Sequence, residues 1–281
     1  MDGRRDALRY AILDPTGNVT ALVRDPVEVA CQPVVARQVM DRHPEVEQVG
    51  FVSGAASDPL AQAELRMAGG EFCGNATMSA AALHAVQAGV APAPGEAPVT
   101  VWMRASGAAE PVEVRLSAAA DGYEADVRMP EALGVRLTAF SHEGLKGQLP
   151  LVLMEGISHV VIETVSPFYE LLGDRPRAER AVRTWCHELG ADGLGLMFLE
   201  GDAPVCQLTP LVYVPGGDTV FWENSCASGS AATGRYLAER TGEPVSLDLQ
   251  EPGGTLHVSC DVAAGQTWLH GAVRLVGKHL L

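Results

Sequence analysis

Two short stretches, one in each half of the chain, constrain the fold more than any other feature of the sequence. The first begins with Cys73 and continues Gly-Asn-Ala-Thr-Met-Ser-Ala, and the second begins with Cys226 and continues Ala-Ser-Gly-Ser-Ala-Ala-Thr. Both are predicted to open helices whose residues are small or apolar nearly all round. A sheet can enclose such a helix on every side. The similarity of the two stretches therefore favours two similar halves that face each other.

Short alternating or β-branched stretches dominate the rest of the chain and predict strands. These stretches are Val19–Val23, Val99–Met103, Val112–Leu116, Leu151–Met154, Val160–Thr164, Leu194–Leu199, Leu211–Val214, Val245–Leu249 and Thr267–Leu269. Helices are predicted at Val27–Arg42, Asn75–Ala88, Ala178–Leu189 and Ser228–Thr241. Many short strands with a few helices predict an α+β protein built on β-sheets or barrels.

Length and composition narrow the class of protein. The 281 residues fit one large domain or two of ordinary size, and a hydrophobic content of 47% allows a sizeable core. The net charge of −15 disfavours nucleic acid and anionic membranes as partners but does not penalise a zwitterionic amino acid. No run approaches the roughly 20 apolar residues of a membrane-spanning helix, and Met1 to Arg9 lead into no signal-type apolar stretch. We therefore expect a cytoplasmic protein with no nucleic-acid or membrane partner.

The six cysteines, at positions 31, 73, 186, 206, 226 and 260, form no C-x-x-C pair. Their spacings resemble neither a zinc site nor a secreted disulfide framework, so free thiols in a reducing compartment are expected. The histidines also lack metal-ligand spacing. The sequence predicts neither a metal nor a cofactor.

Cys73 and Cys226 stand apart because each comes just before the first turn of its predicted helix. The free N–H groups and the positive dipole end at that place favour a thiolate, and they also form a site for a carboxylate. Racemising an amino acid without pyridoxal phosphate needs this combination: a base on one face of the α-carbon, an acid on the other, and positive potential at the carboxylate. Both cysteines could instead be buried structural residues, and spacing alone leaves that alternative open.

Residues 71–79, Glu-Phe-Cys-Gly-Asn-Ala-Thr-Met-Ser, resemble the first cysteine motif of the diaminopimelate epimerase and proline racemase superfamily, and residues 223–229, Glu-Asn-Ser-Cys-Ala-Ser-Gly, resemble the second. Within it, the chain is most similar to the histidine racemases of staphylopine-type opine metallophore biosynthesis. Matching stretches include residues 15–20, 47–51, 210–215, 222–226 and 252–254. Together they cover most of the chain.

The resemblance implies the diaminopimelate epimerase-like fold, in which two pseudo-symmetric domains each form a β-barrel around a central helix, with the active site between them. One domain would comprise residues 1–130 plus about 272–281 and carry Cys73. The other would comprise residues 131–271 and carry Cys226. The last strand would cross back to the first domain from about Ala272. The family also implies a homodimer.

The resemblance assigns Cys73 and Cys226 as the acid/base pair. The other residues it places at the substrate are Asn18, Glu47, Gly74, Asn75, Ser228 and Gly229, of which the last four offer backbone amides to the α-carboxylate. Glu223 stands three residues before Cys226 and is predicted to hold the substrate ammonium or imidazole, although it could be a solvated loop acid. His159 could touch substrate, but beside a Val-Val-Ile strand it is interpreted as structural.

Departures from the epimerase pattern bear on the substrate. Where diaminopimelate epimerases carry a Glu-Arg pair whose Arg holds the distal carboxylate, this chain has Val214-Pro215. A second carboxylate would find no cation there, and a desolvated carboxylate without a partner is costly. We therefore expect an amino-acid substrate with a neutral or weakly basic side chain, and L-histidine first. The alternatives are an epimerase of diaminopimelate, a racemase of another amino acid, and a non-catalytic amino-acid-binding protein.

Overall fold

The computed structural model describes residues 7–54 and 58–281. Its strands follow one another in a single sheet that runs β1-β2-β3-β4-β5-β6-β7-β16-β15-β14-β12-β11-β10-β9-β8, with β13 paired to β12. Residues 1–6 lie outside the described residues. They include most of the N-terminal stretch in which no signal sequence was predicted, and the start of the first predicted domain. No helix of the described chain is long and apolar enough to cross a bilayer.

The first half of the sheet closes into a barrel because β1 pairs with β2 on one side and with β16 on the other. Its strands are β1 (Arg9–Pro15), β2 (Thr20–Val23), β3 (Gln48–Ser53), β4 (Ala63–Met67), β5 (Val99–Ala105), β6 (Val112–Ala119), β7 (Gly122–Arg128) and β16 (Gln266–Leu280). The closing contact pairs Pro15 with Val273 and Arg9 with Leu280. The same strand β16 pairs with β15 through residues 266–270, so it belongs to both halves of the sheet.

The second half contains β8 (Gly134–His142), β9 (Leu145–Leu153), β10 (Ser158–Glu163), β11 (Leu194–Asp202), β12 (Val205–Val214), β13 (Thr219–Trp222), β14 (Val245–Glu251) and β15 (Gly254–Asp261). Most neighbours are antiparallel, but β10–β11 and β12–β14 are parallel. The parallel pair β10–β11 is joined through a short 3-10 segment, η2 (Pro167–Gly173), and the helix α3 (Arg175–Leu189).

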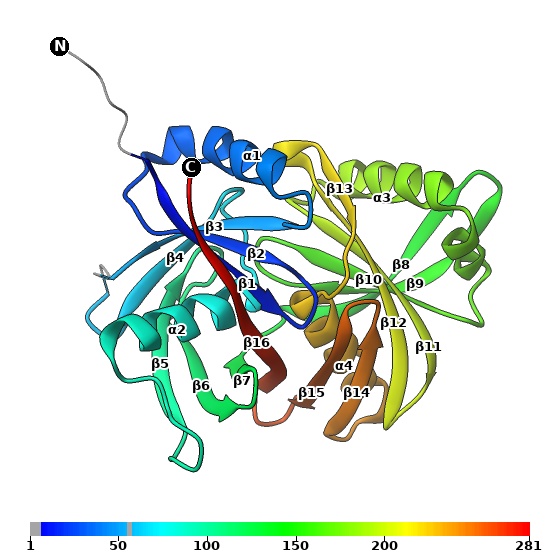
Figure 1. Ribbon diagram of the computed structural model, residues 1–281. Helices are drawn as coiled ribbons and strands as arrows, with labels where there is room; N and C mark the ends of the chain where they lie inside the picture. Colours follow the sequence, from blue (N-terminus) through cyan, green and yellow to red (C-terminus); the bar gives the residue numbers. More distant parts are fainter. Residues whose placement is uncertain (1–6, 55–57) are drawn as a thin grey trace.

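The two small-residue helices lie inside these halves (Figure 1). Helix α2 (Gly74–Ala88) contacts strands all round the barrel and has an unbroken buried run from Gly74 to Leu83. Helix α4 (Ala227–Thr241) packs on β14, β15 and β16 and is buried from Ala227 to Gly234. Alanine, serine and glycine allow this because their side chains leave the backbone room inside the sheet. The predicted enclosure of both helices is confirmed.

Helices α1 (Gln32–Arg42) and α3 cover the outside of the sheet, and both lie at the top of Figure 1. Helix α3 buries one face that includes Trp185 against β11 and β12. The prediction of a helix from Val27 was too long at its start, because Val29–Cys31 form a 3-10 turn, η1, and α1 begins at Gln32. Pro33 suits that first turn, where its missing N–H would have no helical acceptor.

Candidate active site

Each of the two cysteines is the residue immediately before its helix, with extended backbone. Cys73 precedes α2 with φ −133° and ψ 113°, and its sulfur accepts the backbone N–H of Ala76 at 3.4 Å. Cys226 precedes α4 with φ −124° and ψ 97°, and its Sγ lies 3.7 Å from Ser228 Oγ. A side chain at Gly229 would approach Met197 Sδ to 2.1 Å and the Cys226 sulfur to 3.1 Å. The glycine therefore makes room for Met197 beside the thiol.

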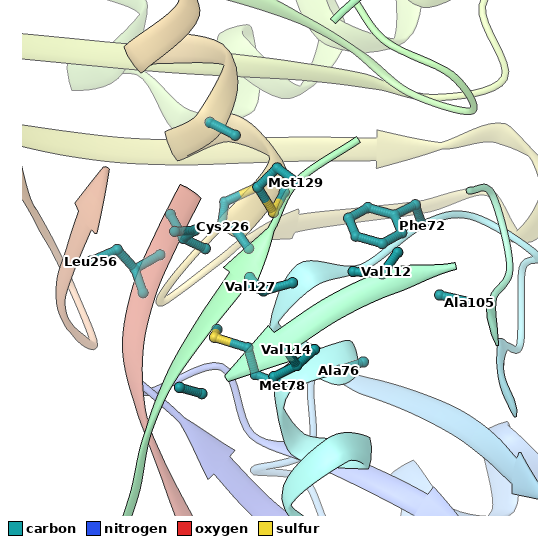
Figure 2. Close-up of a cluster of buried hydrophobic side chains, with 14 of the residues drawn as sticks. Phe72, Ala76, Met78, Ala105, Val112, Val114, Val127, Met129, Cys226 and Leu256 are labelled. Carbon is teal, nitrogen blue, oxygen red and sulfur yellow. The ribbon is translucent and has the colours of Figure 1, made fainter. Parts of the chain in front are cut away.

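The starts of the two helices meet, although half the chain separates them in sequence. A methyl group at Gly74, the first residue of α2, would approach the Ala227 Cβ, at the first residue of α4, to 2.8 Å. The buried Asn75 side chain donates from Nδ2 to the Ser225 carbonyl at 3.1 Å. Phe72, Met129 and Cys226 belong to one hydrophobic cluster around this contact, part of which Figure 2 shows. The fold therefore brings both cysteine motifs to one place.

A chain of polar side chains connects Cys73 with the residues predicted near the cleft. The Cys73 thiol donates to Gln48 Oε1 at 3.1 Å, and the Gln48 amide donates to Asn18 Oδ1 and to Thr20 Oγ1. Asn18 in turn donates from Nδ2 to Glu47 Oε2 at 2.8 Å. Because Asn18 is buried, these bonds fix the orientation of its amide.

Glu47 also joins the two halves of the molecule. Its carboxylate accepts the side-chain amide of Asn224 and, at 3.4 Å, the Asn224 backbone N–H, two residues before Cys226. Burial raises the pKa of Glu47, while the bonds from Asn224 and Asn18 oppose that rise. Glu47 is thus positioned between the segments that carry Cys73 and Cys226, and its contact with the substrate stays a prediction.

Three more glutamates surround the cysteines. Burial raises the pKa of Glu223 and of Glu251 to about 8, and it also raises the pKa of Glu71. Glu223 is close enough to influence both cysteines, and its negative charge opposes a thiolate at either one. Glu223 itself is half-buried, so its setting differs from that of a fully solvated loop acid, and its contact with the substrate stays a prediction.

Burial also decides the protonation of the thiols. It raises the pKa of Cys73 to about 12, against the opposing effect of the Ala76 N–H, and it raises the pKa of Cys226 well above 9. The negative charges of Glu223 and Glu251 add to the rise at Cys226. The N–H groups at the helix starts favour the thiolate, as the sequence predicts, but burial and the acids outweigh them in the protein by itself.

The structure brings together all nine residues that the sequence placed at the site: Cys73, Cys226, Gly74, Asn75, Ser228, Gly229, Asn18, Glu47 and Glu223. Sequence reasoning missed Gln48, Glu71, Asn224 and Glu251. Gln48 directly follows Glu47, Asn224 directly follows Glu223, and Glu71 belongs to the first cysteine motif, so each of these three had a usable signal in the sequence. Glu251 comes from β14 and carried no such signal.

His159 is fully buried on β10, and neither ring nitrogen has a hydrogen-bond partner among the described residues. Burial lowers its pKa to about 3, so the imidazole is neutral. It faces Gly195 on β11, where a methyl group would approach Nδ1 to 2.3 Å. The glycine therefore makes room for the ring.

Neither cysteine lines the two cavities of about 600 and 700 Å³. Gln32 and Arg66 are among the residues that line the first, and Trp102 and Arg128 among those that line the second. Within residues 7–54 and 58–281, no three His, Cys, Asp or Glu side chains are arranged to hold a metal ion.

Comparison with known proteins identifies the family of the chain. The family model for the N-terminal domain of histidine racemase CntK matches residues 7–278. The chain belongs to the histidine racemase CntK family. As a CntK-family member it is an isomerase of the amino-acid racemase and epimerase group. The earlier resemblance is confirmed at the level of the family.

Curated relatives and a solved structure extend this comparison of the CntK-family chain. A histidine racemase of Staphylococcus aureus is 29% identical over 279 residues, which cover 97% of this chain and 96% of that protein. A histidine racemase of Fusobacterium nucleatum is 29% identical over 245 residues, which cover 84% of each. A hydroxyproline epimerase from Agrobacterium vitis superposes with a TM-score of 0.69 at 13% identity, covering 99% of this chain and 91% of that one. That last likeness shows a shared fold.

Proposed function

We propose that this chain interconverts L-histidine and D-histidine, with Cys73 and Cys226 as the two acid/base groups on opposite faces of the α-carbon. The observation that carries the proposal is the contact between the starts of α2 and α4, each headed by a cysteine. Relatives named histidine racemase support the choice of substrate. In this proposal D-histidine is a building block for an opine-type metallophore, as the family resemblance implies.

The proposed mechanism needs no group beyond this chain and its substrate. One cysteine, as thiolate, takes the proton from Cα and becomes a thiol, while the electron pair of the broken C–H bond moves toward the carboxylate. The other cysteine, as thiol, gives its proton to the opposite face of Cα and becomes a thiolate. The two sulfurs thus exchange protonation states, and the opposite enantiomer meets the enzyme in the reverse state.

The α-carboxylate is proposed to lie at the first turns of both helices. The N–H groups there, at Gly74 and Asn75 on α2 and at Ser228 and Gly229 on α4, have no acceptor within their own helices. Aimed at one carboxylate, they stabilise the negative charge that grows on it as the Cα proton leaves. Such stabilisation is required because the α-hydrogen of an amino acid is only very weakly acidic.

The substrate ammonium is proposed to generate the thiolate. The burial that raises the pKa of both thiols acts against their charged form, and a cation within roughly 4–6 Å acts in favour of it. Glu47 and Glu223 provide the carboxylates that would hold this ammonium between the two halves. The bound amino acid would then supply the positive charge that its own deprotonation needs.

The glutamates around the cysteines favour a neutral or basic side chain over a second carboxylate. Glu47, Glu71, Glu223 and Glu251 lie close enough to influence the cysteines or one another. A distal carboxylate, as in diaminopimelate, would meet like charge and the uncharged pair Val214-Pro215. An imidazole can donate a hydrogen bond to a carboxylate, and the negative charge of a carboxylate stabilises its protonated form.

The direct test of the substrate is a comparison of initial rates on a panel of amino acids. Purified reduced protein without added cofactor should racemise L-histidine with a kcat/KM at least about 10-fold above that for diaminopimelate, since an unpaired buried charge costs more than about 1.4 kcal/mol. Faster turnover of diaminopimelate, or of another amino acid, would replace histidine while keeping the two-cysteine mechanism. Binding of histidine without any racemisation would support the non-catalytic alternative.

We also infer an arrangement of two pseudo-symmetric domains, residues 1–130 with 272–281 and residues 131–271, around this site. The inference is supported by barrel closure through β16 and by the matching positions of α2 and α4. A homodimer remains part of the proposal through the family resemblance. Light scattering should then give twice the chain mass of 29.6 kDa, whereas the single-chain mass would contradict the dimer.

A further inference from the structure

Glu251 is a buried acid at the end of β14 that makes two hydrogen bonds to the start of α4. Its side chain is 8% exposed, its Oε2 accepts the Cys226 backbone N–H at 2.6 Å, and its Oε1 accepts the Ser230 hydroxyl. One carboxyl group therefore connects the residue before the helix with the next turn. By accepting the N–H of the residue before the helix, Glu251 does from another strand what the acid of a capping box does, while the Cys226 side chain makes no cap of its own.

The strand end around Glu251 also holds the segment before Cys226. The backbone N–H of Gly253 donates to the Asn224 carbonyl at 2.7 Å, and Asn224 in turn donates to Glu47. A side chain at Gly253 would approach the Asn224 Cβ to 2.9 Å, so the two segments pack closely. The segment 224–226 is thus fixed from the β14–β15 turn on one side and from Glu47 on the other.

We propose that Glu251 is a positioning residue for Cys226: its carboxyl group fixes the backbone from which the thiol projects and sets the charge beside that thiol. The proposal rests on the function proposed above, in which Cys226 transfers a proton at one face of the substrate. Glu251 lies outside both cysteine motifs, and in this role it touches no reacting atom.

Two carboxyl groups, Glu223 and Glu251, face Cys226 from different elements, and their charges also oppose each other. The bonds from Ser230 and from the Cys226 amide favour ionised Glu251, but burial outweighs them, so its pKa is about 8. Near neutral pH the group is mostly protonated and does not oppose the Cys226 thiolate. Above pH 8 it ionises and then disfavours that thiolate. Glu251 thereby limits how readily Cys226 loses its proton in alkaline solution.

Two substitutions alter the charge and the hydrogen bonds of Glu251 in different ways. Glu251→Gln keeps the length, removes the charge and replaces one of the two accepting oxygens by an amide donor. Glu251→Asp keeps the charge and withdraws it from the two donors. Glu243→Gln is the matched control, because Glu243 is an exposed acid just beyond the end of α4. The readout is the ¹³Cβ chemical shift of Cys226 in protein labelled at cysteine, assigned by the loss of that signal in Cys226→Ala. It reports the thiolate fraction directly, without turnover.

At pH 9.5 to 10.5 we expect Glu251→Gln to raise the thiolate fraction of Cys226 at least about 3-fold, equivalent to a downward pKa shift of about half a unit or more. Glu251→Asp should not raise it, and Glu243→Gln should match the parent. Both Glu251 variants should lower kcat about 10-fold or more with KM within about 3-fold, because the thiol is misplaced while the rest of the site is intact. If the Cys226 signal titrates in Glu251→Gln as in the parent, the proposal is wrong.

Failure of this proposal differs from failure of the proposed function. A protein that does not racemise any amino acid would remove the function, yet the Cys226 titration would still report whether Glu251 sets its charge. Racemisation that persists at the parental kcat in both Glu251 variants, with an unchanged titration, would remove only the role of Glu251. Should Glu251→Gln fail to fold, Glu251→Asp with parental kcat would overturn the proposal by itself.

Discussion

Two opposing effects act on the pKa of the Cys73 and Cys226 thiols. The helix starts favour the thiolate, but a helix end contributes only about 0.3–1 kcal/mol in most settings, which is less than one unit of pKa. Burial moves the pKa of a fully buried group by as much as about 3–5 units, and the neighbouring glutamates act in the same direction. Burial therefore wins, and the thiol is the resting form of both cysteines at neutral pH.

This balance predicts that activity rises with pH above neutrality and that Glu223 sets part of the rise. Glu223→Gln removes a charge that opposes both thiolates once Glu223 has ionised, near pH 8. The ascending limb of kcat/KM against pH should then move to lower pH by about half a unit or more, even if the maximum is lower because the ammonium has lost a partner. The measurement is kcat/KM between pH 6 and 10.

Glu188→Gln is the matched control for that experiment, because Glu188 is exposed near the end of α3. It should leave the pH profile unchanged. An ascending limb at the same pH in Glu223→Gln and the parent would show that Glu223 does not influence the thiols.

At the scale of elements, the contact between α2 and α4 is what places the two cysteines at one site. It depends on glycine at position 74, since even a methyl group there would approach Ala227 and Met129 Sδ to 2.8 and 3.1 Å. Gly74→Ala should push the helix starts apart, lower kcat/KM about 10-fold or more, and reduce the free energy of unfolding by about 1–3 kcal/mol. Racemisation rates and urea unfolding measure both effects.

Gly173→Ala provides the comparison for Gly74→Ala. Gly173 ends η2 with a negative or extended φ, and nothing lies within 4 Å of the position that its side chain would take. It should change the free energy of unfolding by no more than about 0.5 kcal/mol and leave kcat/KM unchanged. Equal behaviour of the two variants would mean that close contact at Gly74 is not needed.

The sequence predicted the helices well because their signals are local. Asn75–Ala88 and Ser228–Thr241 match α2 and α4 within one residue at each end, and Gly89 and Gly242 stop them with left-handed backbone. Strands such as β1 and β15 were not predicted. Their residues form strands because β16 and β14 pair with them, and that pairing is not encoded in any short window.

The same distinction holds for the site. The cysteines, their small neighbours and Glu223 could be found because they belong to recognisable motifs in the chain. Glu251 could not, because its place beside Cys226 depends on how β14 packs against α4. Gln48 directly follows Glu47 in the chain, but its bonds to Cys73 and Asn18 cross from β3 to two other segments and depend on the fold.

At the scale of the whole molecule, β16 joins the two halves that contribute one cysteine each. It pairs with β15 and β7 near its start and with β1 from Val273 onward. Because β16 is continuous, it connects the strands of both halves in one sheet. The site between α2 and α4 takes residues from both halves. The net charge of −15 and the four glutamates at the site agree with a substrate that brings positive charge.

The most direct test of the account is incubation of the reduced protein with L-histidine in heavy water, in parallel with Cys73→Ala and Cys226→Ala. Chiral chromatography with mass spectrometry would report D-histidine and deuterium at Cα. The account predicts deuterated D-histidine approaching equal amounts of the two enantiomers for the parent, and racemisation lower by at least about 100-fold in each variant, because each lacks one of the two proton-transfer groups. Racemisation by either variant at the rate of the parent would contradict it.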